Sequence, residues 1–323
     1  MKITAILCTY KRCEKLAQAM ESLAASILPE SDEWEVLVVD NNSPDRTRGV
    51  VEEFVRRYPG RFRYLFEAQQ GKSHALNAGI REARGEILAF VDDDVTVEPS
   101  WLHNLTSDLN NREWAGSGGR ILVPPGFAAP RWLALEGPWR QGAALCAHFD
   151  LGDTPGELKE APYGTNMAFR KELFQRYGGF RADLGPRPGS EIRNEDTEFG
   201  NRVLAGGERL CYVPSAVVYH PVPEERVSKK FFLARWFALG RAQVREKGPR
   251  ARIHGIPRYF FSLPNTALRI FLPQVFGWLR ARDPKERFGR KCVAWCTAGR
   301  MAELLSQAVR GDVAPQGRPV SVK

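Results

Sequence analysis

The sequence contains no uninterrupted apolar run long enough to cross a membrane. The best candidate, Tyr259 to Leu279, is broken by Pro264, Arg269 and Pro273, whereas a spanning helix needs about 20 consecutive, mainly apolar residues. A spanning helix is therefore not expected. An interfacial contact, in which a helix lies along the membrane surface, stays open as an interpretation.

Cysteines are few and show no pattern that a metal site or a disulfide framework would require. The six cysteines form no CxxC pair and have no regular spacing, so neither a zinc cluster nor a disulfide-stapled fold is predicted. The N-terminus does not resemble a signal peptide. We expect a reduced cytoplasmic chain, with peripheral attachment to the inner membrane face left open.

Acidic residues are scarce in the last third of the chain. Residues 221–323 hold 21 Lys and Arg against 7 Asp and Glu, a net charge of +14, whereas residues 1–220 hold 26 against 31, a net charge of −5. Such asymmetry favours an anionic partner for the C-terminal region. We expect an anionic membrane; a solvated basic face, or packing against the rest of the chain or a second copy, is the alternative. No nucleic-acid-binding motif accompanies the charge, so no nucleic-acid partner is expected.

The first 110 residues alternate short apolar segments with amphipathic segments of helix length. This alternation is typical of a parallel sheet covered by helices, that is, of an α/β fold. The strands are expected at residues 3–7, 36–39, 62–66 and 87–91, and the helices at 13–27, 47–58 and 73–84.

Three consecutive carboxylates follow the fourth of these strands. Asp92 and Asp94 should point to one face, because side chains alternate along a strand. Adjacent acids repel one another unless a positive group compensates, so the segment predicts a site for a hard divalent cation. The alternative is an acidic turn that caps a helix beginning near Trp101.

Polar clusters lie at the carboxyl ends of three predicted strands, where ligands bind in sheets of this kind. They are Cys8-Thr9-Tyr10-Lys11-Arg12, Asp40-Asn41-Asn42-Ser43 and Asp92-Asp93-Asp94. Any one of them could be turn chemistry. Three at the ends of three strands predict one shared crevice.

These clusters, in this order, resemble the motifs of family 2 glycosyltransferases, and the resemblance covers about residues 1–221. It implies the GT-A fold, with a Rossmann-like, mostly parallel sheet flanked by helices, here followed by a C-terminal helical extension. The implied divisions are a nucleotide-sugar-binding half at 1–110, an acceptor-binding and catalytic half at 111–223, and a basic helical region at 224–323.

The resemblance implies donor contacts at the strand ends. The first cluster has Cys8 and Lys11 where the family commonly has Pro and Asn, but Thr9, Tyr10 and Arg12 remain available for base and phosphate. A metal, Mn²⁺ or Mg²⁺, would be held by Asp94, with His220 in a place where some members supply a further ligand. The remaining donor residues are Asp40, for a base that is most often uracil, Lys72, for the diphosphate, and Asp92 and Asp93, nearer the ribose or sugar.

The acceptor side resembles the family in three further segments. They are Gly164 to Arg170, Gly178 to Phe180, and the acidic pair Glu195-Asp196. The resemblance implies that Asp196 removes the acceptor hydroxyl proton and that Glu195 positions the acceptor or the base. The expected reaction is inverting transfer from a nucleotide diphosphate sugar, with UDP favoured, to a carbohydrate or lipid-linked hydroxyl in envelope polysaccharide or glycolipid synthesis.

Two other functions compete with this interpretation. A sugar-phosphate nucleotidyltransferase should have a glycine-rich turn after the first strand, and Cys8 to Arg12 contain no glycine. A non-catalytic module that binds nucleotide sugars or a membrane surface should have lost the acids, and all of them are present.

Overall fold

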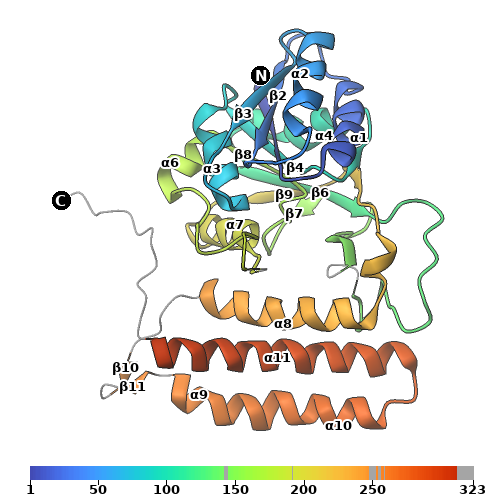
Figure 1. The fold of residues 1–323 in the computed structure, drawn as a ribbon, viewed down its shortest axis with the longest axis vertical. Helices are drawn as coiled ribbons and strands as arrows, with labels where there is room; N and C mark the ends of the chain where they lie inside the picture. The colour runs from blue at the N-terminus through green and yellow to red at the C-terminus, as the bar shows by residue number, and fades with distance from the viewer. Residues whose placement is uncertain (142–144, 191, 247–251, 254–255, 258, 311–323) are drawn as a thin grey trace. The chain divides into compact units, whose positions relative to one another are not determined.

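The structure is a computed structural model that describes residues 1–141, 145–190, 192–246, 252–253, 256–257 and 259–310 (Figure 1). The chain divides into two compact units, which are described separately. The first unit comprises residues 1–124, 149–188 and 195–221, and the second comprises residues 125–148, 189–194 and 222–323.

The first unit is built on a mixed sheet in the order β3-β2-β1-β4-β8-β6-β9-β5, with β7 paired to β9. The four strands at the β3 end run parallel, as the alternation of strands and helices predicted. β8 is antiparallel to both of its neighbours. The strands are β1 (Lys2–Thr9), β2 (Glu33–Asp40), β3 (Phe62–Phe66), β4 (Ile87–Asp92), β5 (Thr96–Val97), β6 (Gly116–Leu122), β7 (Gly156–Glu157), β8 (Asn166–Arg170) and β9 (Leu210–Tyr219).

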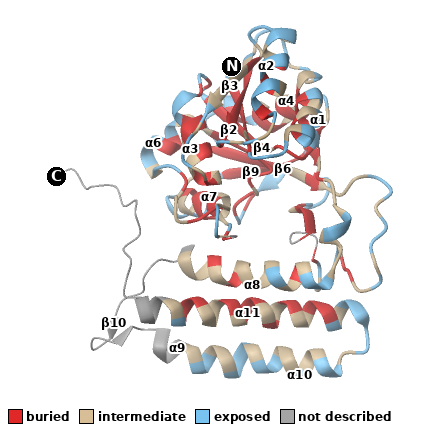
Figure 2. Cartoon of the chain, viewed as in Figure 1, coloured by how far each residue is buried: buried red, intermediate tan, exposed pale blue. Residues whose placement is uncertain are grey.

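Helices on both sides of the sheet bury their apolar faces against it (Figures 1 and 2). α1, for example, buries Leu16, Met20 and Leu23, which recur at helical spacing. The helices are α1 (Cys13–Ala24), α2 (Thr47–Arg57), α3 (Lys72–Glu82), α4 (Trp101–Ser107) with the 3₁₀ turn η1 (Asp108–Asn110), α6 (Lys171–Tyr177) and α7 (Glu195–Ala205).

The register of the parallel strands aligns two of the predicted polar clusters with the third. Thr9 at the end of β1 pairs with Asp40 at the end of β2, and Cys8 pairs with Asp92 at the end of β4. The backbone N–H of Lys11 also donates to Ser43 Oγ at 3.0 Å. The expectation that the strand ends share one edge of the sheet is confirmed.

Strand β6 begins with a glycine-rich segment. Gly116 to Gly119 form the first part of β6, which pairs with β8 and β9. A Cβ at Gly116 would overlap the ring of Phe169, and one at Gly119 would overlap the carbonyl oxygen of Ala216. These glycines therefore permit close strand contact rather than a turn.

The second unit is mainly helical. It contains α8 (Lys229–Glu246), α9 (Tyr259–Thr266), the π-helical turn η3 (Ala267–Phe271), α10 (Leu272–Arg280) and α11 (Pro284–Arg310), besides the 3₁₀ turn η2 (Glu224–Arg226) and the short pair β10 (Arg252–Ile253) and β11 (Ile256–Pro257). Trp132, from the segment that precedes these helices in the chain, packs its ring edge-on against Phe232 of α8 and Phe288 of α11. The described residues of the predicted helical region, 224–323, are helical for the most part, with β10 and β11 as the exception. Residues 247–251, 254–255, 258 and 311–323 lie outside the described part of the chain.

Two glycines set the distance between α8 and α11. A Cβ on Gly240 of α8 would overlap the carbonyl oxygen of Cys296, and one on Gly299 of α11 would overlap that of Phe237. Cys292 and Cys296 are buried on α11 as free thiols. No described helix is long and apolar enough to span a membrane.

Candidate active site

The three consecutive carboxylates after β4 separate into two environments. Asp92 ends the strand and is partly exposed, whereas Asp93 and Asp94 are buried in the turn that follows. Asp92 and Asp94 point to one side, toward His220, and Asp93 points toward the end of β1. The alternation predicted for Asp92 and Asp94 is therefore present.

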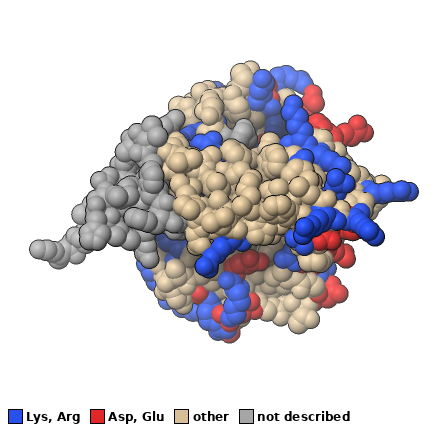
Figure 3. Space-filling view, turned by 90° about the horizontal axis from the view of Figure 1, so that it is seen from below, with Lys and Arg blue, Asp and Glu red and all other residues tan. Residues whose placement is uncertain are grey.

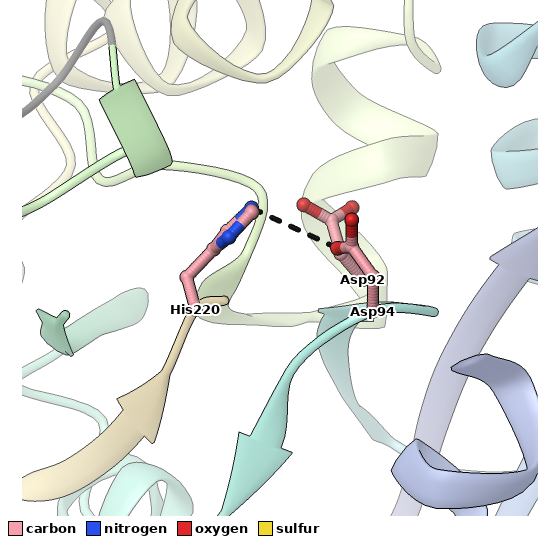
Figure 4. Close-up of side chains that lie close together, drawn as sticks. All are labelled: Asp92, Asp94 and His220. Carbon is pink, nitrogen blue, oxygen red and sulfur yellow. Dashed lines mark ion pairs between the residues drawn. The ribbon is translucent and has the colours of Figure 1, made fainter. Parts of the chain in front are cut away.

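Asp92, Asp94 and His220 form a cluster with the composition of a metal site (Figure 4). One ligand atom from each lies within 4.8 Å of the others, and His220 Nε2 is 3.7 Å from Asp94 Oδ1. His220 directly follows β9, and its backbone N–H donates a hydrogen bond to the carbonyl oxygen of Leu122 at 2.9 Å. Two carboxylate oxygens and one imidazole nitrogen suit Mn²⁺ well.

The histidine ring is oriented for such a role. His220 Nδ1 lies 2.8 Å from the carbonyl oxygen of Pro221, which can only accept a hydrogen bond. Nδ1 therefore carries a proton, and in the neutral ring Nε2, the nitrogen that faces Asp94, has the lone pair. Backbone carbonyls commonly fix metal-binding imidazoles in this way.

Asp93 is directed away from this cluster. Its carboxylate accepts hydrogen bonds from Thr9 Oγ1 at 2.7 Å and Arg12 Nη1 at 3.0 Å. Burial raises the pKa of Asp93 to about 6, and the neighbouring Asp94 and Asp92 act in the same direction, although Arg12 and Thr9 oppose them. Asp93 thus connects the first strand end to the acidic turn.

Lys72 supplies the positive charge that the acids need. Its Nζ lies 2.7 Å from Asp92 Oδ1 and 3.7 Å from Glu195 Oε1. Burial acts to lower the pKa of Lys72, but the carboxylates of Asp92, Glu195 and Asp196 outweigh it and raise the pKa. Burial likewise acts to raise the pKa of Asp92, yet the charge of Lys72 and hydrogen bonds from Lys72 and Thr165 hold it well below its usual range.

The position of Lys72 is set by Asn41 and Gly71. Asn41 Oδ1 accepts the backbone N–H of Gly71 at 2.7 Å, and its Nδ2 donates to the carbonyl oxygen of Gln69 at 2.8 Å. Gly71 has φ of +139°, a backbone conformation that L side chains rarely adopt. The end of β2 thereby fixes the start of α3, where Lys72 is the first residue.

Asp40 occupies the end of β2 and is already engaged on both oxygens. Oδ1 accepts the backbone N–H of Ser43 at 2.9 Å, and Oδ2 accepts the hydroxyl of Tyr64 at 2.9 Å. Burial raises the pKa of Tyr64 to about 12, and the hydrogen bond to Asp40 adds to the effect. Each carboxylate oxygen has two lone pairs, so Asp40 keeps capacity for a further donor.

The first cluster combines buried and open side chains. Thr9 is buried against Asp93, whereas Tyr10 and Arg12 are exposed. Arg12 Nη1 also contacts Asp94 Oδ2 at 3.1 Å. Tyr10 is therefore the member of this cluster with an aromatic ring open to a ligand.

Glu195 and Asp196 are the first two residues of α7. Glu195 is buried and lies beside Lys72. Asp196 accepts the backbone N–H of Gly164 on Oδ2 at 2.6 Å and that of Thr197 on Oδ1 at 2.7 Å. A Cβ on Gly164 would lie 2.9 Å from Asp196 Oδ2, so glycine is required for this contact.

Several residues of the site were not singled out by the sequence. Thr165 donates from Oγ1 to Asp92 Oδ2 at 2.6 Å; it lies in the segment Gly164 to Arg170 that resembles the family's acceptor side, but no role was expected for it. Tyr64 likewise acts by holding Asp40. Asn41 was expected in the crevice as a member of the second polar cluster, but its bond to Gly71 was not. These contacts join segments far apart in the chain, and no local spacing of residues predicts them.

Known proteins match more than half of this chain. The family model for "Glycosyl transferase family 2" matches residues 4–178. "Succinoglycan biosynthesis protein ExoM" of Rhizobium meliloti (strain 1021) is 31% identical over 251 residues, which cover 77% of this chain and 76% of that protein. "Glucosyl-dolichyl phosphate glucuronosyltransferase" of Haloferax volcanii is 26% identical over 249 residues, covering 74% of this chain and 75% of that protein.

Solved structures agree with the fold. The mannosyltransferase PcManGT from Pyrobaculum calidifontis, in complex with GDP-Man and Mn²⁺, has a TM-score of 0.57 at 20% identity, covering 96% of this chain and 76% of that one. GalNAc-T7 with UDP, GalNAc and Mn²⁺ has a TM-score of 0.56 at 15% identity, covering 95% of this chain and 58% of that one. The predicted GT-A fold is confirmed, and with more than half of its length matched by the family model, the chain belongs to glycosyltransferase family 2.

Proposed function

We propose that this chain transfers a sugar from a nucleoside diphosphate sugar to a hydroxyl acceptor, with inversion at the anomeric carbon. The observation that carries the proposal is the grouping of Asp92, Asp94 and His220 beside Lys72 and the Glu195-Asp196 pair. This grouping offers a cation site, a fixed positive charge and carboxylates in one place. The names of the relatives support a role in polysaccharide or glycolipid synthesis.

The cation would be held by Asp92, Asp94 and His220. This assignment adds Asp92 to the two ligands that the sequence suggested, because its carboxylate lies with theirs. When bound, a divalent cation would neutralise the negative charge of the donor diphosphate and of the leaving group. Asp93, which faces Thr9 and Arg12, would keep the turn in place for the donor.

The acidic pair Glu195-Asp196 would serve the transfer of the acceptor's hydroxyl proton. Asp196 would accept the proton of the acceptor hydroxyl as the oxygen forms its bond to the anomeric carbon. The bond from that carbon to the diphosphate oxygen breaks at the same time, and the electron pair stays on the diphosphate. Backbone hydrogen bonds from Gly164 and Thr197 hold the Asp196 carboxylate in one orientation. Glu195 would orient Lys72 for the phosphate groups.

Uridine diphosphate is the donor nucleotide that we propose. The supporting feature is the Asp40 carboxylate at the end of β2, which can accept the N3–H of uracil, with Tyr10 open for contact with the base. Guanine also presents N–H donors, and PcManGT was crystallised with GDP-Man. The base must therefore be decided by direct competition.

The test is calorimetric titration with UDP, GDP, dTDP and CDP, each with and without Mn²⁺. We expect manganese-dependent binding of UDP, lost in Asp94→Ala and retained in the matched control Asp153→Ala, whose carboxylate is exposed. Preference for another nucleotide would overturn the uridine assignment alone. Failure of all four nucleotides to bind would overturn the donor site as a whole.

A further inference from the structure

The helical segment from η3 through α10 presents an apolar face that stays exposed among the described residues of the second unit. Leu268, Leu272, Phe276 and Leu279 have exposed fractions of 65%, 38%, 55% and 59%. They follow one another at intervals of four, four and three residues, which places them on one side of a helix. We call these four residues the apolar stripe. At 1.5 Å per residue it runs for about 16 Å.

The opposite side of α10 is the one that packs within the unit. The Trp278 ring lies 6.1 Å from that of Trp295 on α11, centroid to centroid, and Lys291 Nζ lies 4.6 Å from the Trp278 ring. Gly277 gives Arg290 room to approach. The helix therefore has an inner face against α11, and the apolar stripe forms its outer face.

The surroundings of the stripe are basic. Arg269, Arg280, Arg282 and Lys285 are exposed, and residues 247–282 contain seven Lys and Arg and no Asp or Glu. The acid that follows, Asp283, accepts the backbone N–H of Glu286 at 2.7 Å and so serves the start of α11. Figure 3, which views the molecule from the side of α9 and α10, shows a broad area without charged side chains, with Lys and Arg along its border.

We propose that the apolar stripe docks on the surface of an anionic lipid bilayer. An apolar outer face with basic residues around it is the arrangement by which helices lie in the membrane interface. Anionic headgroups would attract Arg269, Arg280 and Arg282, and the stripe would enter the boundary between headgroups and acyl chains. Pairing two copies through this face would bring like charges together, so charge complementarity favours lipid over a second copy.

The test is flotation of the full-length protein with two kinds of vesicle. One is phosphatidylcholine alone, and the other is equal parts of phosphatidylcholine and phosphatidylglycerol. We expect binding only to the second kind, weakened by raised salt. Leu272→Ser with Phe276→Ser should lower the partition coefficient about tenfold per residue, and Arg280→Gln with Arg282→Gln should lower it about fivefold per residue.

Matched controls lie in the first unit. Ile27→Ser removes an apolar side chain that is more exposed (70%) than Leu272 or Phe276, and Arg56→Gln removes an exposed arginine of α2. Both variants should leave vesicle binding unchanged. UDP titration of every variant checks that the nucleotide site is intact, so loss of vesicle binding is distinguishable from failure of the proposed transferase site.

Three outcomes would overturn the proposal. The first is wild-type protein that binds neither kind of vesicle. The second is vesicle binding that the stripe variants leave unchanged. The third is a dimer, seen by light scattering, that the stripe variants convert to monomer while no vesicle is bound, because a second copy would then be the occupant.

Discussion

At the residue scale, the assignment of the proton acceptor depends on how Asp196 is held. Its two oxygens take backbone hydrogen bonds from Gly164 and Thr197, which fix the carboxylate without neutralising it by an ion pair. Glu195, by contrast, is buried beside Lys72. The two adjacent acids therefore have different surroundings, and only Asp196 is proposed as the base.

We expect Asp196→Asn to abolish transfer while leaving nucleotide binding nearly intact. Asparagine keeps one oxygen for the Gly164 N–H but cannot take up a proton, and removal of a general base typically costs about 10²- to 10⁴-fold in rate. The measurement is kcat for sugar transfer or donor hydrolysis, together with calorimetric binding of UDP and Mn²⁺. An equal loss of binding and turnover would contradict the assignment, and Asp153→Asn is the control.

At the scale of elements, helices and strands pack closely in several places because glycine lies at the point of contact. Gly240 and Gly299 bring α8 and α11 together, and Gly116 and Gly119 bring β6 against its neighbours. Glycine has no Cβ, so the strands and helices at these points can approach more closely than side chains would otherwise permit. The stability of both units therefore depends on glycines that have no catalytic or binding role.

Gly240→Ala should destabilise the protein by about 1–3 kcal/mol, because the new methyl group meets the backbone of α11 and the helices must separate. The matched control is Gly49→Ala in α2, where an added Cβ meets no atom within 4 Å. There the gain in helix propensity should stabilise the protein by about 0.5–1 kcal/mol. Urea unfolding of both variants measures the difference, and equal effects would refute the packing argument.

Glu303 connects α11 to α8 through two arginines. Its carboxylate contacts Arg241 Nε at 2.8 Å and Arg245 Nε at 2.7 Å. Burial acts to raise the pKa of Glu303, but the hydrogen bonds from Arg245 and Arg241 outweigh it, and the pKa is lowered. Because the pKa of Glu303 is lower in the folded state than in the unfolded state, the ionised carboxylate stabilises the fold at pH values above its unfolded-state pKa. This stabilisation is lost as the pH falls through the folded-state pKa.

We therefore expect Glu303→Gln to cost about 1–2 kcal/mol at pH 7, discounted for the partial exposure of both arginines. The gap between wild type and variant should narrow as pH falls below the ordinary glutamate pKa of 4.5. Urea midpoints measured from pH 7 downward check this. A gap that stays constant over that range would show that the ion pairs contribute nothing.

The sequence predicted the parallel part of the sheet and the strand-end clusters because both are local. Alternating apolar and amphipathic segments define β1 to β4 and their helices, and the acids of Asp92 to Asp94 follow directly from a buried strand. It did not predict that Gly116 to Gly119 lie in a strand, because the reason is contact with Phe169 and Ala216, which are distant in the chain. The partnership of Thr165 with Asp92 was missed for the same reason.

At the scale of the whole molecule, the chain consists of two compact units. The proposed nucleotide and metal site lies entirely in the first unit, and the apolar stripe lies entirely in the second. A ligand that binds the native state stabilises what it binds, by about 2.7 kcal/mol at one hundred times its dissociation constant.

We expect UDP with Mn²⁺ to raise the midpoint of one thermal transition and to leave a second transition unchanged, while Glu303→Gln lowers the second alone. Differential scanning calorimetry of the full chain, with and without the ligands, makes the measurement. Asp94→Ala should remove the ligand-induced shift. A single transition displaced by both changes would show that the two units unfold together.

The ion pair between Lys72 and Asp92 has a consequence for the order of events in the proposed site. Lys72 already acts as an internal counterion for Asp92, one of the acids that would bind the metal, so a free divalent cation arriving alone must compete with an ammonium group for the same carboxylate. A nucleoside diphosphate offers that ammonium new negative partners. Cation and nucleotide should therefore bind cooperatively, and each should bind weakly without the other.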